Sequence, residues 1–211
     1  QMLSQETITV VASRTRINAT QDNYRKPRVL ALVNCDPVCD WQAGRSLETV
    51  LAGLGVTYQV VSSEDEFVQR LGRDWYNVIW LDAGARFSEA TAQRMREAAQ
   101  LGVGIVAQRQ PGDPGAIEQA GGMILKSVTG SPASVLLQGT WLGTASELPV
   151  AGGLASLEAL PATQTQPAAS IQAAYGGGMP AFSVASLGSG SVAMAGFDPV
   201  ASALASPTPW T

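Results

Sequence analysis

The sequence predicts an α/β domain. We expect a doubly wound, mostly parallel sheet of the flavodoxin-like or amidotransferase-like kind, with a C-terminal antiparallel β extension. Between residues 28 and 126, short apolar runs alternate with segments of helical period, the pattern of a parallel sheet with helices on both faces. Beyond residue 127 the helical period disappears, and the chain becomes rich in Ala, Gly, Ser, Thr and Pro.

The first strand and helix have clear signals. Residues 28–34 form a short apolar run, which is typical of a strand buried on both faces. In the next segment the apolar residues recur with a period of 3.6, so we expect a helix that ends at Gly55. These residues are Ala43, Leu47, Val50, Leu51 and Leu54.

The strand and helix unit then repeats. A strand over 56–61 precedes a capping box at 63–66, which opens a helix carrying Phe67 and Leu71. Ser88 is placed to cap a later helix that ends at Gly102. Trp80 lies inside an apolar strand, which favours burial. The remaining elements expected in this half are strands over 76–82, 103–108 and 123–126 and a short helix over 115–120.

The last third is expected to be rich in short strands. Segments 134–138 and 170–174 are candidates, and 180–186 with 191–197 are expected to form a hairpin around Gly188-Ser189-Gly190. At the other end, the β-branched run 6–12 predicts a strand from a preceding β module, and 13–27 a linker. The expected domains are therefore 1–27 (strand and linker), 28–205 (α/β, with 127–205 as the low-charge extension) and 206–211 (tail).

Composition excludes several functions. None of the 211 residues is histidine, so the chain cannot build a Ser-His-Asp or Cys-His triad, and most catalytic zinc sites are also excluded. The net charge is -4 and no basic patch is present, which argues against nucleic acid binding. No apolar run approaches the ~20 residues needed to span a bilayer, so no membrane insertion is expected. We expect no cofactor and no metal.

Polar residues follow several of the expected strands. In an open parallel sheet, ligands bind beyond the carboxyl ends of the strands, so these residues define a candidate crevice for a cation or a polar ligand. They are Asp36, Asp40, Asp82, Arg109, Asp113 and Lys126. The alternative is structural, because loops are polar and aspartates favour helix N-termini.

A subset of these residues resembles the phospho-acceptor site of response-regulator receiver domains. Asp36 follows the first strand, Asp82 ends the third and Lys126 ends the fifth. The resemblance implies that one carboxylate accepts a phosphoryl group, another helps to hold Mg²⁺, and the lysine contacts the phosphoryl oxygens. The sequence departs from that family after the fourth strand, where Gln108 or Arg109 stands in place of the expected hydroxyl residue.

Two cysteines occur close together, as Cys35-Asp-Pro-Val-Cys39. The spacing is not that of a redox C-x-x-C pair, and two cysteines do not complete a structural zinc site. In an exported protein they are expected to form a local disulfide, which would brace the loop after the first strand. The alternatives are two free thiols in a cytosolic protein, or one reactive thiol.

Segments 28–34, 76–84, 103–108 and 187–198 together resemble the class I glutamine amidotransferase-like superfamily, in the non-catalytic version found in exported bacterial multi-domain proteins. Active members carry a Cys on the turn after a central strand, with a His and a Glu further on. Here that turn, Arg109 to Asp113, has no Cys, and the chain has no His.

The resemblance implies a non-enzymatic interaction or structural domain of an envelope-associated protein in the periplasm or at the cell surface. Other domains of the parent chain, or envelope proteins, would be its partners. Only two lysines occur in the chain, Lys26 and Lys126, and such a composition is also typical of exported bacterial proteins.

Overall fold

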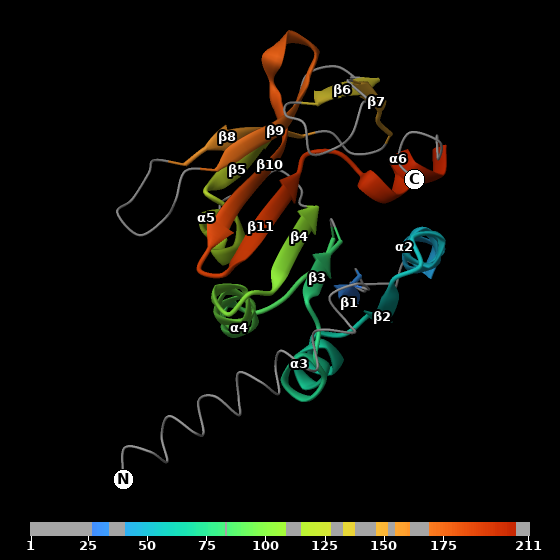
Figure 1. Ribbon diagram of the computed structural model, residues 1–211, viewed down its shortest axis with the longest axis vertical. Helices are drawn as coiled ribbons and strands as arrows, with labels where there is room; N and C mark the ends of the chain where they lie inside the picture. The colour runs from blue at the N-terminus through green and yellow to red at the C-terminus, as the bar shows by residue number, and fades with distance from the viewer. Residues whose placement is uncertain are drawn as a thin grey trace, which may run out of the picture.

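The computed structural model describes residues 27–33, 41–82, 84–108, 115–127, 133–137, 147–151, 155–160 and 169–205. Within them the chain forms an α/β fold around a mixed nine-stranded sheet in the order β2-β1-β3-β4-β11-β10-β9-β6-β7 (Figure 1). The expected α/β class is confirmed. The expected strand over 6–12 lies outside the described residues.

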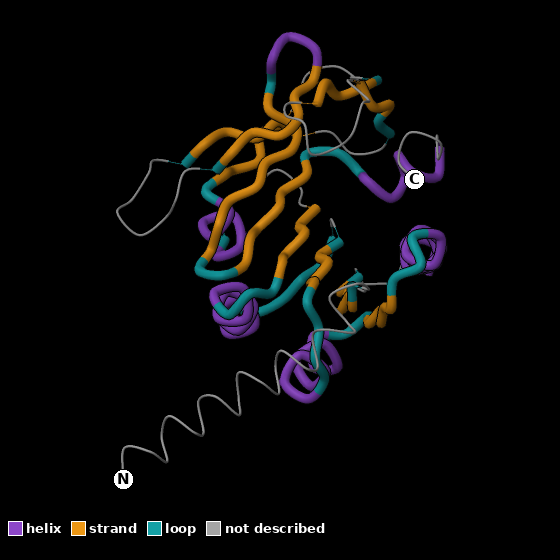
Figure 2. Tube along the Cα trace, viewed as in Figure 1, coloured by secondary structure: helices purple, strands orange, loops and turns teal. Residues whose placement is uncertain are grey.

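The first five strands of this order are parallel and the last four join it antiparallel. The parallel strands are β2 (Thr57–Val61), β1 (Arg28–Leu32), β3 (Val78–Leu81), β4 (Gly104–Gln108) and β11 (Gly190–Ala195). The antiparallel strands are β10 (Pro180–Leu187), β9 (Ser170–Tyr175), β6 (Ser134–Leu137) and β7 (Glu147–Pro149). Strands β9 and β10 are linked by the short 3-10 turn η1 (Gly176–Gly178), which Figure 2 draws as the purple arch at the top of the view, joining the ends of the two strands.

Helices lie on both faces of the sheet. One face carries α3 (Glu64–Arg73), α4 (Glu89–Gln100) and α5 (Ala116–Gly121), and the other carries α2 (Trp41–Gly53) and α6 (Pro199–Ala205) (Figure 1). The right-handed rule for crossover connections explains this division. The connection from β1 to β2 runs toward one edge of the sheet, whereas the connections from β2 to β3 and from β3 to β4 run toward the other edge. The helices of the two sets therefore lie on opposite faces. No helix of the described residues is long and apolar enough to cross a membrane.

Residues 123–127 form a strand, but its expected place as fifth strand of the parallel sheet is wrong. Strand β5 (Met123–Ser127) pairs antiparallel with β8 (Ala155–Ala159) in a separate two-stranded sheet. The physical reason is the length of α5. Its six residues rise about 9 Å, whereas a five-residue strand spans about 17 Å. The helix by itself therefore covers only about half the length of a strand, and in the structure β11 takes the fifth position instead.

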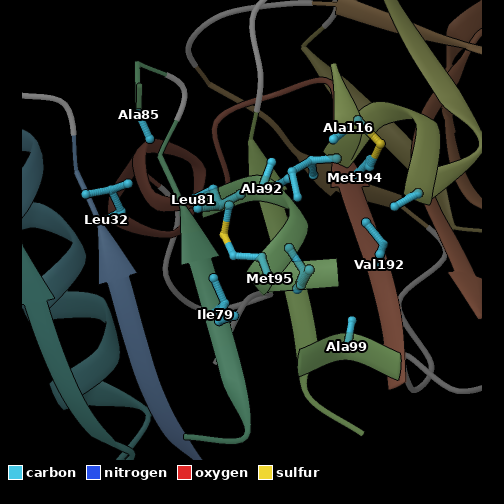
Figure 3. Close-up of a cluster of buried hydrophobic side chains, with 14 of the residues drawn as sticks. Leu32, Ile79, Leu81, Ala85, Ala92, Met95, Ala99, Ala116, Val192 and Met194 are labelled. Atoms are coloured by element: carbon cyan, nitrogen blue, oxygen red, sulfur yellow. The ribbon is translucent and has the colours of Figure 1, made fainter. Parts of the chain in front are cut away.

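The main core lies beneath α3, α4 and α5. Ile79 and Leu81 of β3 point toward Met95 of α4 (Figure 3), and Ile79, Leu81 and Met95 are each 0% exposed. Alternate residues of β1 belong to different cores: Leu30 and Leu32 to this one, and Val29, Ala31 and Val33 to the cluster under α2 and α6. Strand β1 is therefore buried on both faces, as its apolar run predicts.

The turn between β10 and β11 docks on the end of α4. The Ser189 N–H donates to the Gln100 carbonyl at 3.0 Å. Gly188 has φ +61°, and a Cβ added there would lie 2.5 Å from the Gln100 carbonyl oxygen. A side chain at this position would thus clash with backbone as well as strain the turn. The hairpin and α4 are consequently fixed to each other through backbone atoms.

Replacing Gly188 with Ala is expected to lower the free energy of unfolding by about 2 kcal/mol or more, because both strain and overpacking oppose it. Urea unfolding followed by circular dichroism measures the loss. Gly72→Ala is the matched control: Gly72 lies in α3 with no heavy atom within 4 Å of an added Cβ, so this change is expected to stabilise by about 0.5–1 kcal/mol. Equal effects of the two substitutions would contradict the account of the turn.

Candidate functional site

The carboxyl ends of the five parallel strands meet at one edge of the sheet, where the sequence predicts a ligand crevice. Among the six predicted crevice residues, the described part of the chain includes Asp82 and Lys126. Asp36, Asp40, Arg109 and Asp113 lie outside the described residues, and so do Cys35 and Cys39. The site is therefore built here from the described side chains at the same edge.

Asp82 lies at this edge and Lys126 does not. The Asp82 N–H donates to the Leu32 carbonyl at 3.1 Å, and the Asp82 carbonyl accepts from the Ala85 N–H at 2.9 Å. Lys126 is on β5 in the two-stranded sheet, half exposed, with Nζ 3.8 Å from Oε2 of Glu158. The receiver-like pairing of Asp82 with a lysine at the end of the fifth parallel strand is therefore wrong, because β11 occupies that position.

Glu64 connects the beginnings of two helices at this edge. Its Oε1 accepts from the Ser88 N–H at 2.8 Å, from the Ser88 hydroxyl at 2.5 Å and from the Thr91 hydroxyl. Ser63 and Ser88 also cap α3 and α4, since their hydroxyls accept the N–H groups of Glu66 and Thr91. One carboxylate thus joins α3 to α4 through three donors.

The same hydrogen bonds set the ionisation of Glu64. Donation from the Ser88 and Thr91 side chains, with a contribution from the Ser88 N–H, holds the pKa of the Glu64 carboxyl below its ordinary value, against the opposing effect of burial. A carboxylate stabilised in its charged form is a poor general base near neutral pH. The role that these contacts support for Glu64 is therefore structural: its carboxylate holds the beginnings of α3 and α4 together.

Asp198 has a similar role after β11. Its carboxylate accepts from the Ala201 N–H at 2.8 Å, and its carbonyl accepts from the Ser202 N–H at 3.0 Å. The buried Ser202 hydroxyl donates to the Asp198 carbonyl at 2.5 Å and accepts from the Ala151 N–H at 2.9 Å. Asp198 thus starts α6 and ties it to the segment after β7.

Two buried polar atoms near this edge have no hydrogen-bond partner among the described residues. One is the Trp80 indole Nε1 on β3, and the other is Oε1 of Gln108, which ends β4. Gln108 is 6% exposed. A buried polar group without a partner costs about 1–3 kcal/mol, so each of these two groups lowers the stability of the fold at this edge.

The arrangement combines two carboxylates at helix N-termini, those of Glu64 and Asp198, with the uncharged Trp80 donor and Gln108 acceptor. Within the described ranges, no group of three or more His, Cys, Asp or Glu side chains is placed to hold a metal ion. The sequence pointed to Glu64 through its capping box and to Asp82 through its place after a strand. It did not point to Gln108 or Trp80, although a glutamine at the end of an apolar strand indicates a polar side chain at the carboxyl edge of the sheet.

No protein-family model matches the chain, and no curated protein matches it in sequence. Its fold is similar to that of several solved structures. A β-galactosidase from Bacillus circulans sp. alkalophilus covers 84% of this chain and 30% of its own, with a TM-score of 0.58 and 15% identity. An exo-β-1,4-mannosidase from an Opitutaceae bacterium covers 90% and 35%, with a TM-score of 0.56 and 14% identity.

A putative ThuA-like protein from Bacteroides uniformis matches over most of both chains. It covers 82% of this chain and 83% of its own, with a TM-score of 0.51 and 13% identity. The chain therefore spans about a third of the two glycosidases and most of the ThuA-like protein. At such identities, the likeness is one of fold alone.

The Glu64→Gln substitution is expected to lower the free energy of unfolding by about 1–2 kcal/mol at pH 7, because the charged acceptor of three donors is lost. The folded-state pKa of Glu64 is depressed, so its stabilising contribution is present above the ordinary pKa of a glutamate. The contribution is lost as the pH falls through the depressed value.

Urea unfolding of wild type and variant from pH 7 to pH 3 tests this, and the difference between them should shrink toward the acid end. Asp65→Asn is the control, since Asp65 is exposed on the same helical turn. A Glu64→Gln effect that does not change with pH would contradict the assignment.

Proposed function

We propose that this chain is a non-catalytic α/β domain of a longer, exported, envelope-associated bacterial protein, and that it acts by binding or positioning other protein domains. The observation that carries the proposal is that the carboxylates at the carboxyl ends of the parallel strands hold helix N-termini in place. There Glu64 joins two helices and Asp198 starts a third, so these carboxylates serve the scaffold. The absence of histidine from the whole sequence agrees with this role.

The fold supports the same proposal. We assign the parallel strands β2-β1-β3-β4-β11 to a flavodoxin-like order, extended by the antiparallel strands β10, β9, β6 and β7. Within that order we propose membership of the class I glutamine amidotransferase-like superfamily, in its non-catalytic version. The match to about a third of two longer glycosidases is compatible with a fold that serves as one domain of a larger chain.

The 211-residue chain is expected not to hydrolyse glutamine, because it lacks an imidazole base. It is also expected not to bind Mg²⁺ at millimolar concentration, because the described residues place no group of three or more carboxylates together to hold the ion. Ammonia release and isothermal titration with MgCl₂ are the measurements. Glutamine turnover would contradict the proposal. Binding of Mg²⁺ by the wild type but not by Asp82→Asn would contradict it in favour of a cation site.

Export predicts the state of the two cysteines. Chain secreted into an oxidising compartment and purified without reductant is expected to show no reactive thiol after denaturation, with the mass of a monomer, because Cys35 and Cys39 are then joined. The Cys35→Ser variant is the control and should show one reactive thiol. Two reactive thiols in the wild type would contradict the export proposal.

A further inference from the structure

The two edges of the nine-stranded sheet are built differently. At one edge, β7 has three residues, ends at Pro149 and carries the charged Glu147, which accepts from the Ser134 hydroxyl. A short strand, a proline and a charge are features that keep another strand from adding to an edge. At the other edge, β2 has five residues, and none of them is charged or a proline. The edge at β2 therefore lacks the features that protect the edge at β7.

The backbone groups on the open side of β2 belong to Tyr58 and Val60. The Thr57 N–H donates to the Pro27 carbonyl at 3.0 Å, so Thr57 bonds toward β1. Because successive strand residues direct their backbone groups to opposite sides, Gln59 also faces β1, whereas Tyr58 and Val60 face the open edge. Within the described ranges, the only hydrogen bond to the groups on this side runs from Nε2 of Gln59 to the Val60 carbonyl, at 3.3 Å.

The side chains of β2 alternate between an apolar and a polar side. Tyr58 and Val60 pack against the cluster under α2 and α6, and both are partly exposed. Thr57 and Gln59 point to the opposite face, where Thr57 is exposed and Gln59 is partly buried. A strand that pairs with this edge continues both sides, with apolar residues beside Tyr58 and Val60 and uncharged polar residues beside Thr57 and Gln59.

Residues 6–12, which lie outside the described residues, carry this pattern in the sequence. Every second position is apolar, as Ile8, Val10 and Ala12, and threonines stand at positions 7 and 9 between them. Val11 is the one departure from the alternation. Threonine, valine and isoleucine are also the residues that strands favour. The segment thus offers one apolar and one polar side, as a strand beside β2 requires.

The chain enters the described fold beside this edge. Pro27 is the first described residue, and its carbonyl accepts from Thr57 at the amino end of β2. Residues 13–26 can span about 45–50 Å when extended, whereas neighbouring strands lie only about 5 Å apart. A strand antiparallel to β2 ends at the amino end of β2. Such a strand therefore connects back to Pro27 without a crossover of the sheet.

We propose that residues 6–12 add to β2 as an antiparallel edge strand of the same molecule. Because the apolar sides of the two strands coincide, Val10 lies opposite Tyr58 or Val60, and its N–H donates to β2. Tethering favours this pairing, since a flexible linker gives an effective concentration on the order of millimolar. The proposal assigns to the α/β sheet a strand that the sequence by itself attributes to a preceding module. The pairing goes beyond the proposed function and does not depend on it.

Hydrogen exchange of single amides, followed by NMR on the full 211-residue chain, tests the pairing. The Tyr58 and Val60 N–H groups are expected to exchange at least about ten-fold more slowly in the wild type than in the Val10→Pro variant. Proline removes the donor at position 10 and so disrupts the pairing. The Gln59 N–H faces β1 and should stay protected in both proteins, which verifies that β2 remains folded.

Thr9→Pro is the matched control. In the proposed arrangement the Thr9 N–H faces away from β2, and an edge strand tolerates a proline whose nitrogen faces solvent. Tyr58 and Val60 should therefore exchange in this variant as slowly as in the wild type. Light scattering is expected to give the mass of a monomer for the wild type and for both variants, because the added strand comes from the same molecule.

Four outcomes would overturn the inference. They are wild-type Tyr58 and Val60 amides that exchange as fast as those of an unfolded peptide, protection that persists in Val10→Pro, equal effects of the two proline variants, and a dimer that loses the protection on dilution. The last outcome would assign the edge to a strand of a second copy. Glutamine hydrolysis or Mg²⁺ binding would reject the proposed function and leave this pairing standing.

Discussion

The insertion of β11 between β4 and β10 is the interaction on which the rest of this fold depends. β11 is parallel to β4 and antiparallel to β10, so it joins the parallel half of the sheet to the antiparallel half. Its Val192 and Met194 complete the core under α4 and α5. A Cβ on Gly121 would lie 2.5 Å from Met194 Sδ, which shows how closely α5 approaches this strand.

This arrangement has a cost in folding. β4 and β11 lie far apart in sequence, so a long loop must close before they can pair. The conformational entropy lost in closing this loop is not offset until the hydrogen bonds between the two strands form. The hairpin of β10 and β11 is local by comparison, and its turn contacts the end of α4 through Ser189. We therefore expect the hairpin to form first and then to dock onto the edge of β4, which until then is unpaired.

The two faces of the sheet are covered by different means. Crossover helices α3, α4 and α5 bury one face continuously, whereas the other face has a buried cluster at each end and leaves Val106, Ala193 and Val184 partly exposed between them. Charged residues are instead used at the carboxyl edge, where Glu64 and Asp198 hold helix N-termini in place.

The sequence by itself determined the α/β class, the strands and helices between residues 28 and 127, and the lack of imidazole chemistry, because these follow from local periodicity, capping residues and composition. The capping box at 63–66 and the cap predicted at Ser88 correctly placed the starts of α3 and α4. Each of these signals depends only on residues that are close together in the chain, so it can be recognised without knowledge of the tertiary structure.

Only the tertiary structure decided which strand fills the fifth parallel position, because strand pairing depends on the length of α5 and on contacts between distant segments. For that reason Lys126 was misplaced, and β7 and β8 were not predicted. The place of Trp80 inside an apolar strand likewise favoured its burial, whereas in the structure its side chain is partly exposed. An apolar residue meets the condition for burial, but whether another element covers it is decided by the arrangement of the whole chain.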